Sequence, residues 1–533
     1  MRSGQRAVWL AVAVVALCGL LGGLYGPRVQ ATVAGGSDVQ QSLRTFTQVY
    51  AIVEQNYADP VDADRAIYQG AIPGMLRSLD PHSSFFDARS FSLLREEQRG
   101  AYYGVGMTVG PRDGRTIVVA PFVGSPAYKV GLRPGDVIFR VDGKLVEGMN
   151  TSEIADMLKG PKGTIVQVEV LREGYDEPLA FAITRDEIPR LSVEYFFELR
   201  PRVGYVKLAS FNEKTHEELA NALAELKAES LTGLVLDLRG NPGGLLTEGV
   251  AVAEMFLDKN QLIVSHRGRS QRERRYHATR SGPGHDFPLV LLIDRYSASA
   301  AEIVAGAIQD HDRGLIVGET SFGKGLVQTV YPLSYNSGLA LTTARYYTPS
   351  GRLIQRDYSA VSLYNYYYSQ SRENNSQDMH TTDGGRSVYG GGGISPDVEV
   401  RYPELKGFEE ELVRRLILYP FDVGVGDFAK RYLAGHPEIS RDFEVDDEVM
   451  QAFRRYLTER NIRYTEPDLQ QSLEWIKLRI KKEIFLSAFG RDEGQRVAVS
   501  GDVMVQRAIE LLPQAKELAE KTRRIIAQRA KGE

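Results

Sequence analysis

Two serines and a lysine in the second half of the chain have the residue types of a nucleophile and its base. The stretch YSASAAEIVAGAIQD (296–310) follows the apolar run PLVLLID (288–294), which predicts a buried strand turning into a helix. Ser297 and Ser299 would lie in the first turn of that helix. Serines at a helix start commonly cap backbone amides, so their position alone leaves open whether either one attacks a substrate.

The candidate base is Lys324, in the segment GLIVGETSFGKGLVQTVYPL (314–333). A serine hydroxyl is a poor nucleophile at neutral pH unless a base takes its proton. Lys324 lies between two glycines, and its nearest acidic neighbour in sequence is Glu319. Desolvation in such a setting lowers the pKa of a lysine, and its neutral amine can then accept a proton. Gln328, four residues later, is placed to hydrogen-bond or orient the amine.

Residues 318–324 also fit G-x-x-x-x-G-K, the start of a phosphate-binding loop. Gly325 stands where that motif needs Ser or Thr for magnesium, and the run at 326–333 alternates like a strand where a helix should follow. The nucleotide-binding interpretation is therefore disfavoured. Neither G-x-S-x-G nor H-E-x-x-H occurs in the sequence, and His311 fits a surface turn better than a base.

Backbone donors for an oxyanion are the third requirement of acyl transfer by a serine. The stretch LVLDLRGNPGGLLTEG (234–249) predicts a strand, a turn with the pair Gly243 and Gly244, and then a helix. Glycine at this place lets an amide approach a substrate closely. N-P-G-G by itself is more often a structural turn.

The elements that must position these residues form an α/β region. Between 203 and 400, short apolar runs suited to a buried sheet alternate with amphipathic helices, which predicts an α/β layer. Residues 359–393 are rich in Tyr, Ser, Asn and Gly and are interpreted as an extended surface insertion. Residues 37–100 and 401–533 are helical in pattern, and the second of these stretches carries no chemical motif.

A small β-rich module precedes the α/β region, at 102–186. Its run GSPAYKVGLRPGDVIFRVDGKLV (124–146) resembles the central part of PDZ domains. In such domains a peptide adds as a strand at an edge, and its terminal carboxylate sits in a glycine loop. The helix expected at 151–159 would line the same groove. The resemblance places the peptide-binding residues at Gly104, Val105, Gly106 and Met107.

Composition narrows the class of protein. With 533 residues, 43% hydrophobic and 25% charged, the chain has the composition of a multidomain globular protein. Its net charge is −4 and no long block of like charges occurs, which argues against a nucleic-acid partner. The only cysteine, Cys18, lies in the N-terminal apolar segment, so disulfides, zinc–thiolate sites and a cysteine nucleophile are excluded elsewhere.

The N-terminus has the pattern of an export segment. Arg2 and Arg6 precede an uncharged run at 7–26, and VQA at 29–31 resembles a signal peptidase site. A cleaved signal peptide and an uncleaved membrane anchor both remain open. Either one predicts a location in the periplasm or cell envelope.

Seven segments taken together resemble the carboxyl-terminal processing (tail-specific) serine proteases of bacteria and plastids. They are LDPHSSFF, the PDZ run, LDLRGNPGG, SASAAEIVAGAIQD, VGETSFGKGLVQ, YYTPSGRLIQ and GGGGISPDV, and they span about residues 40–400 in this order. The resemblance implies a multidomain α/β (α+β) chain. Its parts would be a ClpP/crotonase-like serine protease core, an inserted PDZ domain and helical N- and C-terminal regions.

The resemblance also assigns roles to residues. In that family the nucleophile is the serine of S-A-S that stands 25 residues before the lysine of F-G-K-G, which is Ser299 and not Ser297 here. Two departures are Ala301, where many members have a further serine, and the insertion after Arg356. The remaining implied roles are general base for Lys324, accessory glutamine for Gln328, and oxyanion amides for Gly244 and Ala300.

The expected organisation has five parts. They are a signal peptide or anchor (1–31), an N-terminal helical part of the protease (37–100), the PDZ domain (102–186), the protease core with the Ser/Lys dyad (190–400) and a helical C-terminal region (401–533). No role follows from the sequence for the last part, where oligomer contacts and a substrate-blocking element are both open.

The predicted function is that of an exported serine endopeptidase that cleaves proteins near their C-termini, without a cofactor or metal. Its partners would be proteins or peptides with free C-termini, with room for an adaptor protein, a homo-oligomer and membrane association through the N-terminal segment. The resemblance further implies gating by PDZ movement. The alternative is a catalytically silent PDZ scaffold or chaperone in the cell envelope.

Overall fold

The computed structural model describes residues 37–270, 272–280, 286–359, 362–368, 375–405, 407–418 and 424–532. The predicted signal peptide or anchor at 1–31 lies outside these ranges. Within them, no helix is both long enough and apolar enough to cross a membrane. The chain divides into two compact units, Met1–Ser78 and Leu79–Glu533.

The described part of the first unit is helical, as its sequence pattern predicts. It contains α2 (Ser37–Asn56), a π-helical stretch (Arg65–Ala71) and α3 (Ile72–Arg77). The turn before the π-helical stretch is held by Asp62, whose carboxylate accepts hydrogen bonds from the amides of Asp64 and Arg65.

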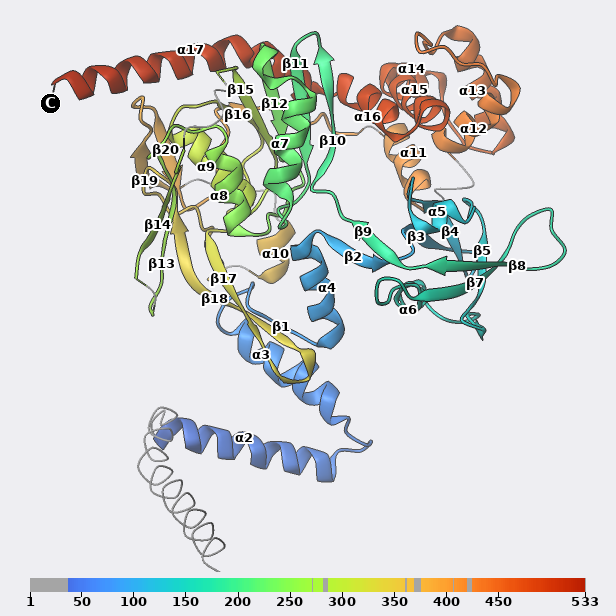
Figure 1. Ribbon diagram of the computed structural model, residues 1–533, viewed down its shortest axis with the longest axis horizontal. Helices are drawn as coiled ribbons and strands as arrows, with labels where there is room; N and C mark the ends of the chain where they lie inside the picture. The colour runs from blue at the N-terminus through green and yellow to red at the C-terminus, as the bar shows by residue number, and fades with distance from the viewer. Residues whose placement is uncertain are drawn as a thin grey trace, which may run out of the picture. The chain divides into compact units, whose positions relative to one another are not determined.

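A six-stranded, mostly parallel sheet is the centre of the second unit (Figure 1). All neighbouring strands pair in parallel except the first two, which are antiparallel. The two central strands are completely buried, as expected for apolar runs covered on both faces. The strand order is β10 (Val193–Arg200), β11 (Val203–Leu208), β12 (Gly233–Asp237), β15 (Leu289–Ile293), β16 (Leu315–Gly318) and β21 (Val398–Glu399).

Helices cover both faces of this sheet, and alternate strand residues contact different helices. Leu234 and Leu236 share a core with α7 (Thr215–Glu225), α8 (Leu246–Glu254) and α9 (Ala300–Asp310). Val235, between them, shares the opposite core with α17 (Val503–Gly532). Helix α17 is therefore a layer of the central α/β fold, which its sequence pattern did not indicate (Figure 1).

A second sheet carries the segment after Lys324. Its strands are β1 (Ser84–Phe86), β13 (Leu262–Arg267), β14 (Arg274–His277), β17 (Leu326–Pro332) and β18 (Gly338–Tyr347). The central β18 pairs with β1, β13 and β17. The motif LDPHSSFF is thereby brought beside the strand that contains Gln328.

The PDZ module has its own sheet and its own apolar core. Two strands lead into and out of it, β2 (Ala101–Gly104) and β9 (Asp186–Pro189), and they pair with each other. Its helix α6 (Thr151–Leu158) begins with a capping box formed by Asn150 and Glu153. The strands are β3 (Met107–Arg112), β4 (Arg115–Pro121), β5 (Val137–Val141), β6 (Lys144–Leu145), β7 (Ile165–Leu171) and β8 (Leu179–Thr184).

The C-terminal region is helical, as predicted, and has two kinds of packing. Phe428, Phe453 and Ile480 belong to an apolar core of its own, separate from the sheet. Only its last part, α17 with Val499 of α16 (Arg491–Ser500), contributes to the core of the sheet. The other helices are α11 (Gly407–Leu418), α12 (Val425–Gly435), α13 (Asp447–Glu459), α14 (Glu466–Gln471) and α15 (Leu473–Phe489).

The insertion after Arg356 is not simply an extended surface segment, which corrects the expectation for residues 359–393. It contains α10 (Leu363–Tyr368) and the hairpin of β19 (Asn375–Thr381) and β20 (Ser387–Gly390). Arg386 explains why the hairpin packs inward, because its guanidinium forms ion pairs with Asp312 at 2.7 Å and Asp397 at 2.5 Å.

Candidate active site

Ser299 occupies a strained position at the start of α9. Its φ of 54° and ψ of −114° are rare for a residue with a side chain, and such strain concentrates at functional sites. The helix that follows is buried along its whole length, which fixes the position of its first turn. The serine is thus held by a rigid element in an unusual backbone conformation, as nucleophiles on sharp strand-to-helix turns are.

The two candidate serines make different hydrogen bonds. The Ser297 hydroxyl donates to the Leu238 carbonyl at 2.8 Å and accepts from the Asp294 amide at 2.9 Å, so it is fully used in the turn. Ser299 instead begins α9 in a capping box with Glu302, whose carboxylate accepts a hydrogen bond from the Ser299 amide at 2.8 Å. The interpretation of Ser297 as a turn residue is confirmed, whereas Ser299 lines the cavity described below.

Glu302 joins the backbones of Ser299 and Lys324. Its carboxylate accepts hydrogen bonds from the amides of Ser299 at 2.8 Å, Lys324 at 2.9 Å and Gly323 at 2.7 Å, and from the Ser321 hydroxyl. The side chain is 1% exposed, and burial raises its pKa while these hydrogen bonds act in the opposite direction. Sequence reasoning missed this residue, although S-x-x-E before an apolar run is a capping-box signature.

Lys324 has the environment of a base. Burial lowers the pKa of its amine, against the opposing charges of Glu302 and Asp80. The amine donates a hydrogen bond to Oε1 of Gln328 at 3.0 Å. Gln328 in turn donates to the carbonyl of His82, so its side chain is held in one orientation.

One cavity of 640 Å³ brings the candidate residues together. Ser299, Lys324 and Gln328 line it, along with Gly243 and Gly244. Among the described residues that line this cavity, the Lys324 amine donates a hydrogen bond to Gln328 and makes none with the Ser299 hydroxyl. Apolar walls are supplied by Leu245, Leu246, Ile303, Leu326 and Tyr346.

The glycine pair lies against Ser299. A Cβ atom on Gly243 would come within 2.7 Å of the Ser299 Cβ, so only glycine fits. Gly244 forms a parallel bridge with Phe211, in which the Gly243 carbonyl and the Leu245 amide make the hydrogen bonds. The amide of Gly244 stays outside this bridge. Ala300 is the first residue of α9, where helix amides point out of the N-terminus.

His82 belongs to the site, although its motif LDPHSSFF entered the predictions only as part of the family resemblance. It lines the cavity, and its Nε2 lies 2.9 Å from the hydroxyl of Tyr366 in the insertion. Burial and the charge of Lys324 lower its pKa to about 4, so its ring is neutral at pH 7. Only the fold reveals this placement, because Tyr366 is far away in sequence.

His311 is not the surface turn residue that its sequence suggested. Its side chain is 8% exposed and lies 2.7 Å from the Asp383 carboxylate and 2.7 Å from the Leu262 carbonyl. The hairpin insertion supplies Asp383, which could not be read from residues around His311.

The PDZ module has a groove of 370 Å³ at the expected place. Val105, Gly106 and Met107 line it, opposite Ala155 and Leu158 of α6. Gly106 has a φ of 76°, and a Cβ there would collide with Ser125 at 2.5 Å. Gly104 lies outside this lining, in β2, where it pairs with Asp186.

These features define a serine-type hydrolase with a peptide-binding module, and known families agree. Residues 202–360 match peptidase family S41, and 117–172 match the PDZ domain. Residues 27–90 match the activating protease CtpB N-terminal domain. Residues 424–468 match the C-terminal helical domain of probable PDZ-proteases.

Individual proteins show the same relationship. A carboxy-terminal-processing protease of Bartonella bacilliformis is 41% identical over 329 residues, covering 61% of this chain and 75% of that protein. The carboxy-terminal processing protease CtpB of Bacillus subtilis is 34% identical over 332 residues, covering 62% and 68%. The solved photosystem II D1 C-terminal processing protease is 34% identical, covers 64% of this chain and 84% of that chain, and has a TM-score of 0.34.

The chain belongs to the carboxy-terminal processing proteases of peptidase family S41. It is therefore a serine protease with a PDZ domain, acting on protein substrates. The predicted family and fold class are confirmed. The role of each site residue stays a prediction.

Proposed function

We propose that this protein is an exported endopeptidase that cleaves proteins near their C-termini, with Ser299 as nucleophile and Lys324 as general base. The observation that carries the proposal is their arrangement. Both residues line one cavity, and the Glu302 carboxylate binds the backbone amides of both. A second support is the lowered pKa of the Lys324 amine, which favours its neutral form.

The proposed reaction starts when the neutral Lys324 amine takes the proton of the Ser299 hydroxyl as the oxygen attacks the scissile carbonyl. The amides of Gly244 and Ala300 stabilise the oxyanion. Lys324 returns the proton to the leaving amine, which breaks the peptide bond and leaves an acyl-enzyme. Lys324 then activates a water that releases the new C-terminus from Ser299. Gln328 holds the amine in place throughout.

The PDZ groove supplies the proposed preference for chain ends. A substrate tail would add as a strand beside β3, with apolar side chains against Val105, Met107 and Leu158. Its terminal carboxylate would accept hydrogen bonds from amides of the 104–107 loop. The apolar walls of the catalytic cavity favour an uncharged residue at the cleavage position.

Location and assembly are part of the proposal. The uncharged run at 7–26 supports export to the periplasm or cell envelope, as a soluble protein or anchored by this segment. The match of residues 27–90 to the CtpB N-terminal domain supports binding of an adaptor protein or of a second copy of the chain by this part. Fractionation of cells, with N-terminal sequencing of the mature chain, separates the cleaved from the anchored form.

Turnover of an unfolded substrate with an apolar C-terminal tail tests the assignment. Ser299→Ala should lose all measurable cleavage, and Lys324→Arg should do the same because it keeps the charge but offers no neutral amine. Full activity in either variant would refute that residue's role. A wild type that binds the tailed substrate without cleaving it would support the scaffold alternative.

The tail preference has its own test. Peptides with a free carboxylate should stimulate cleavage of a second substrate more than the same peptides with an amidated end. An equal response to both would count against capture of the carboxylate by the 104–107 loop.

A further inference from the structure

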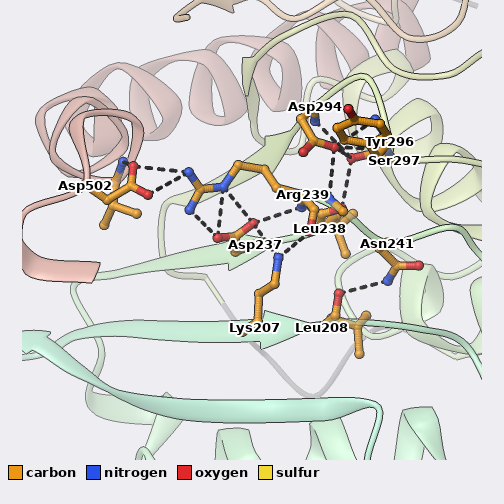
Figure 2. A network of polar contacts seen from close by, with 12 residues as sticks. Lys207, Leu208, Asp237, Leu238, Arg239, Asn241, Asp294, Tyr296, Ser297 and Asp502 are labelled. Carbon is orange, nitrogen blue, oxygen red and sulfur yellow. Dashed lines mark hydrogen bonds and ion pairs between the residues drawn. The ribbon is translucent and has the colours of Figure 1, made fainter. Parts of the chain in front are cut away.

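The loop that carries Gly243 and Gly244 is attached to the C-terminal region by a buried ionic network. Figure 2 shows Arg239, at the start of this loop, between the carboxylates of Asp237 and Asp502. Asp237 ends β12, but Asp502 lies just before α17, in the part of the chain for which the sequence offered no role. The side chain of Arg239 is only 10% exposed and that of Asp502 only 16%.

The guanidinium of Arg239 divides its donors between these two carboxylates. Its Nε and Nη2 donate to Asp237, and its Nη1 donates to both oxygens of Asp502, at 3.1 and 2.9 Å. The hydroxyl of Tyr402 contacts Nη1 and donates to Asp502 at 2.6 Å. The planar fork of an arginine suits such a two-sided arrangement, which a lysine could not reproduce.

Asp502 is itself fixed by the helix that it begins. Its Oδ1 accepts hydrogen bonds from the amides of Met504 at 2.9 Å and Val505 at 3.2 Å. Met504 and Val505 are fully buried against the sheet. The carboxylate that reaches Arg239 is therefore held by the docked position of α17.

From Arg239 the network continues to the nucleophile. The amide of the next residue, Gly240, donates to Asp294 at 2.9 Å. Asn241 then accepts a hydrogen bond from the amide of Ala298, directly before Ser299, at 2.9 Å. The Asn241 side chain also accepts from the amide of Gly243 at 2.8 Å. A shift of the loop at Arg239 would thus reach both Gly243 and the turn that holds Ser299.

We propose that Asp502 is a positioning residue of the protease, which holds the 239–244 loop in register with Ser299 through Arg239. The C-terminal region thereby takes part in catalysis without touching the substrate. Docking of α17 and alignment of the Gly244 amide become one linked event. The inference rests on the proposed function, in which this loop supplies an oxyanion donor.

The fold provides a way to separate this role from stability. Asp502→Asn keeps the shape and an oxygen that can cap α17, since asparagine is a good N-cap residue. It removes the negative charge that faces Arg239, which remains paired with Asp237. Asp286→Asn is the matched control, because Asp286 forms the exposed ion pair of α17 with Arg523 at 2.9 Å.

Steady-state kinetics and hydrogen exchange on the full chain test the proposal. For Asp502→Asn we expect kcat to fall about 10- to 100-fold with KM changed less than about 2-fold, because a small misplacement of catalytic groups acts on the transition state. Exchange of the loop amides at 238–245 should accelerate. Asp286→Asn should match the wild type in both measurements.

A double-mutant cycle identifies Arg239 as the route. Arg239→Lys should also lower kcat, and adding Asp502→Asn to it should cost little more, because both changes break the same contact. Fully additive effects would overturn the proposal. An unchanged kcat in Asp502→Asn would overturn it too, as would activity losses in Asp502→Asn and Asp286→Asn that only follow their melting temperatures.

The exchange measurement also separates this inference from the proposed function. It can be made in the Ser299→Ala background, where it needs no turnover. Suppose that Asp502→Asn accelerates exchange at 238–245 in this background, but that Ser299→Ala alone still cleaves substrate. The link between α17 and the loop would then be retained, and only the assignment of Ser299 as nucleophile would be refuted. If Asp502→Asn leaves exchange at 238–245 unchanged and Ser299→Ala is inactive, the link between α17 and the loop would be refuted and the nucleophile assignment retained.

Discussion

Two buried carboxylates flank the candidate active site, and they are satisfied in opposite ways. Glu302 and Asp237 are each only 1% exposed. The hydrogen bonds that Glu302 accepts come from backbone amides and the Ser321 hydroxyl, which are all neutral. Asp237 contacts two cations, Arg239 and Lys207, as well as the Tyr205 hydroxyl. Burial raises the pKa of Glu302, whereas the cations hold that of Asp237 well below its usual range.

The difference shows what each arrangement can do. Neutral donors fix backbone segments while leaving the negative charge of Glu302 to act on its surroundings, including Lys324. The negative charge of Asp237 is neutralised by the adjacent cations Lys207 and Arg239. It therefore holds these side chains in place and has little electrostatic effect on more distant groups. Glu302 acts on the pKa of Lys324, the proposed base, whereas Asp237 holds Arg239 at the start of the 239–244 loop.

The largest expected change in stability follows from Asp237→Asn. Removing one partner of a buried ion pair leaves the other charge uncompensated, and here Lys207 and Arg239 would both be affected. We expect a loss of about 3–5 kcal/mol in the free energy of unfolding, measured by denaturant titration of the full chain. Asp286→Asn, which breaks the exposed ion pair with Arg523, should change the denaturant midpoint of unfolding little. Equal midpoints for the two variants would contradict the anchoring role.

Glu302→Gln should cost less stability and more activity. A glutamine has one acceptor oxygen and presents an amide group toward the donors of Ser299, Gly323 and Lys324. We expect a loss of about 1–3 kcal/mol in unfolding free energy and a fall in kcat of about 100-fold. Glu319→Gln makes the same change of charge at the start of the loop that Glu302 binds, and it should keep wild-type kcat. Wild-type turnover in Glu302→Gln would show that its hydrogen bonds do not align the dyad.

The pH dependence distinguishes the two carboxylates directly. Activity should rise with pH as Lys324 loses its proton, and the acidic limb of kcat/KM reports the pKa of this base in the free enzyme. A nearby negative charge raises that pKa, so Glu302→Gln should move the limb to lower pH. Asp237→Asn should leave its position unchanged. A limb that stays in place in Glu302→Gln would remove Lys324 as the titrating group.

The smallest expected effect belongs to Asp80, the second acidic group that raises the pKa of Lys324. Asp80→Asn should shift the acidic limb in the same direction as Glu302→Gln, by a smaller amount. His82 also faces Lys324, but with a pKa of about 4 it is neutral over the range of the measurement. A larger shift for Asp80→Asn than for Glu302→Gln would reverse the assignment of the dominant charge.

The sequence was sufficient for features defined by local pattern. Apolar runs predicted the buried strands, the G-L-x-x-G-D run predicted the PDZ module, and family spacing favoured Ser299 over Ser297. The hydrogen bond that the Ser297 hydroxyl accepts from the Asp294 amide in its own turn agrees with that choice. Such features depend on residues that are close together in the chain.

Features that depend on distant partners were not predictable. The Glu302 carboxylate contacts a loop whose first bonded residue, Ser321, is nineteen residues later, and nothing near Asp502 in sequence indicates that it meets Arg239. The amphipathic pattern of α17 shows that one face is buried, but not which surface buries it. His82 and Tyr366 meet only because β1 and the insertion lie beside the same cavity.

The position of α17 sets the order in which the enzyme can mature. The strands at 203–318 are complete long before residues 503–515 leave the ribosome, and until then one face of the sheet has no cover. An emerging chain therefore cannot hold the arrangement proposed for the site until residues 503–515 have been made and packed against the sheet. Docking of α17 would therefore come after the strands have formed, and the proposed catalytic arrangement would be complete only once this helix has covered the sheet.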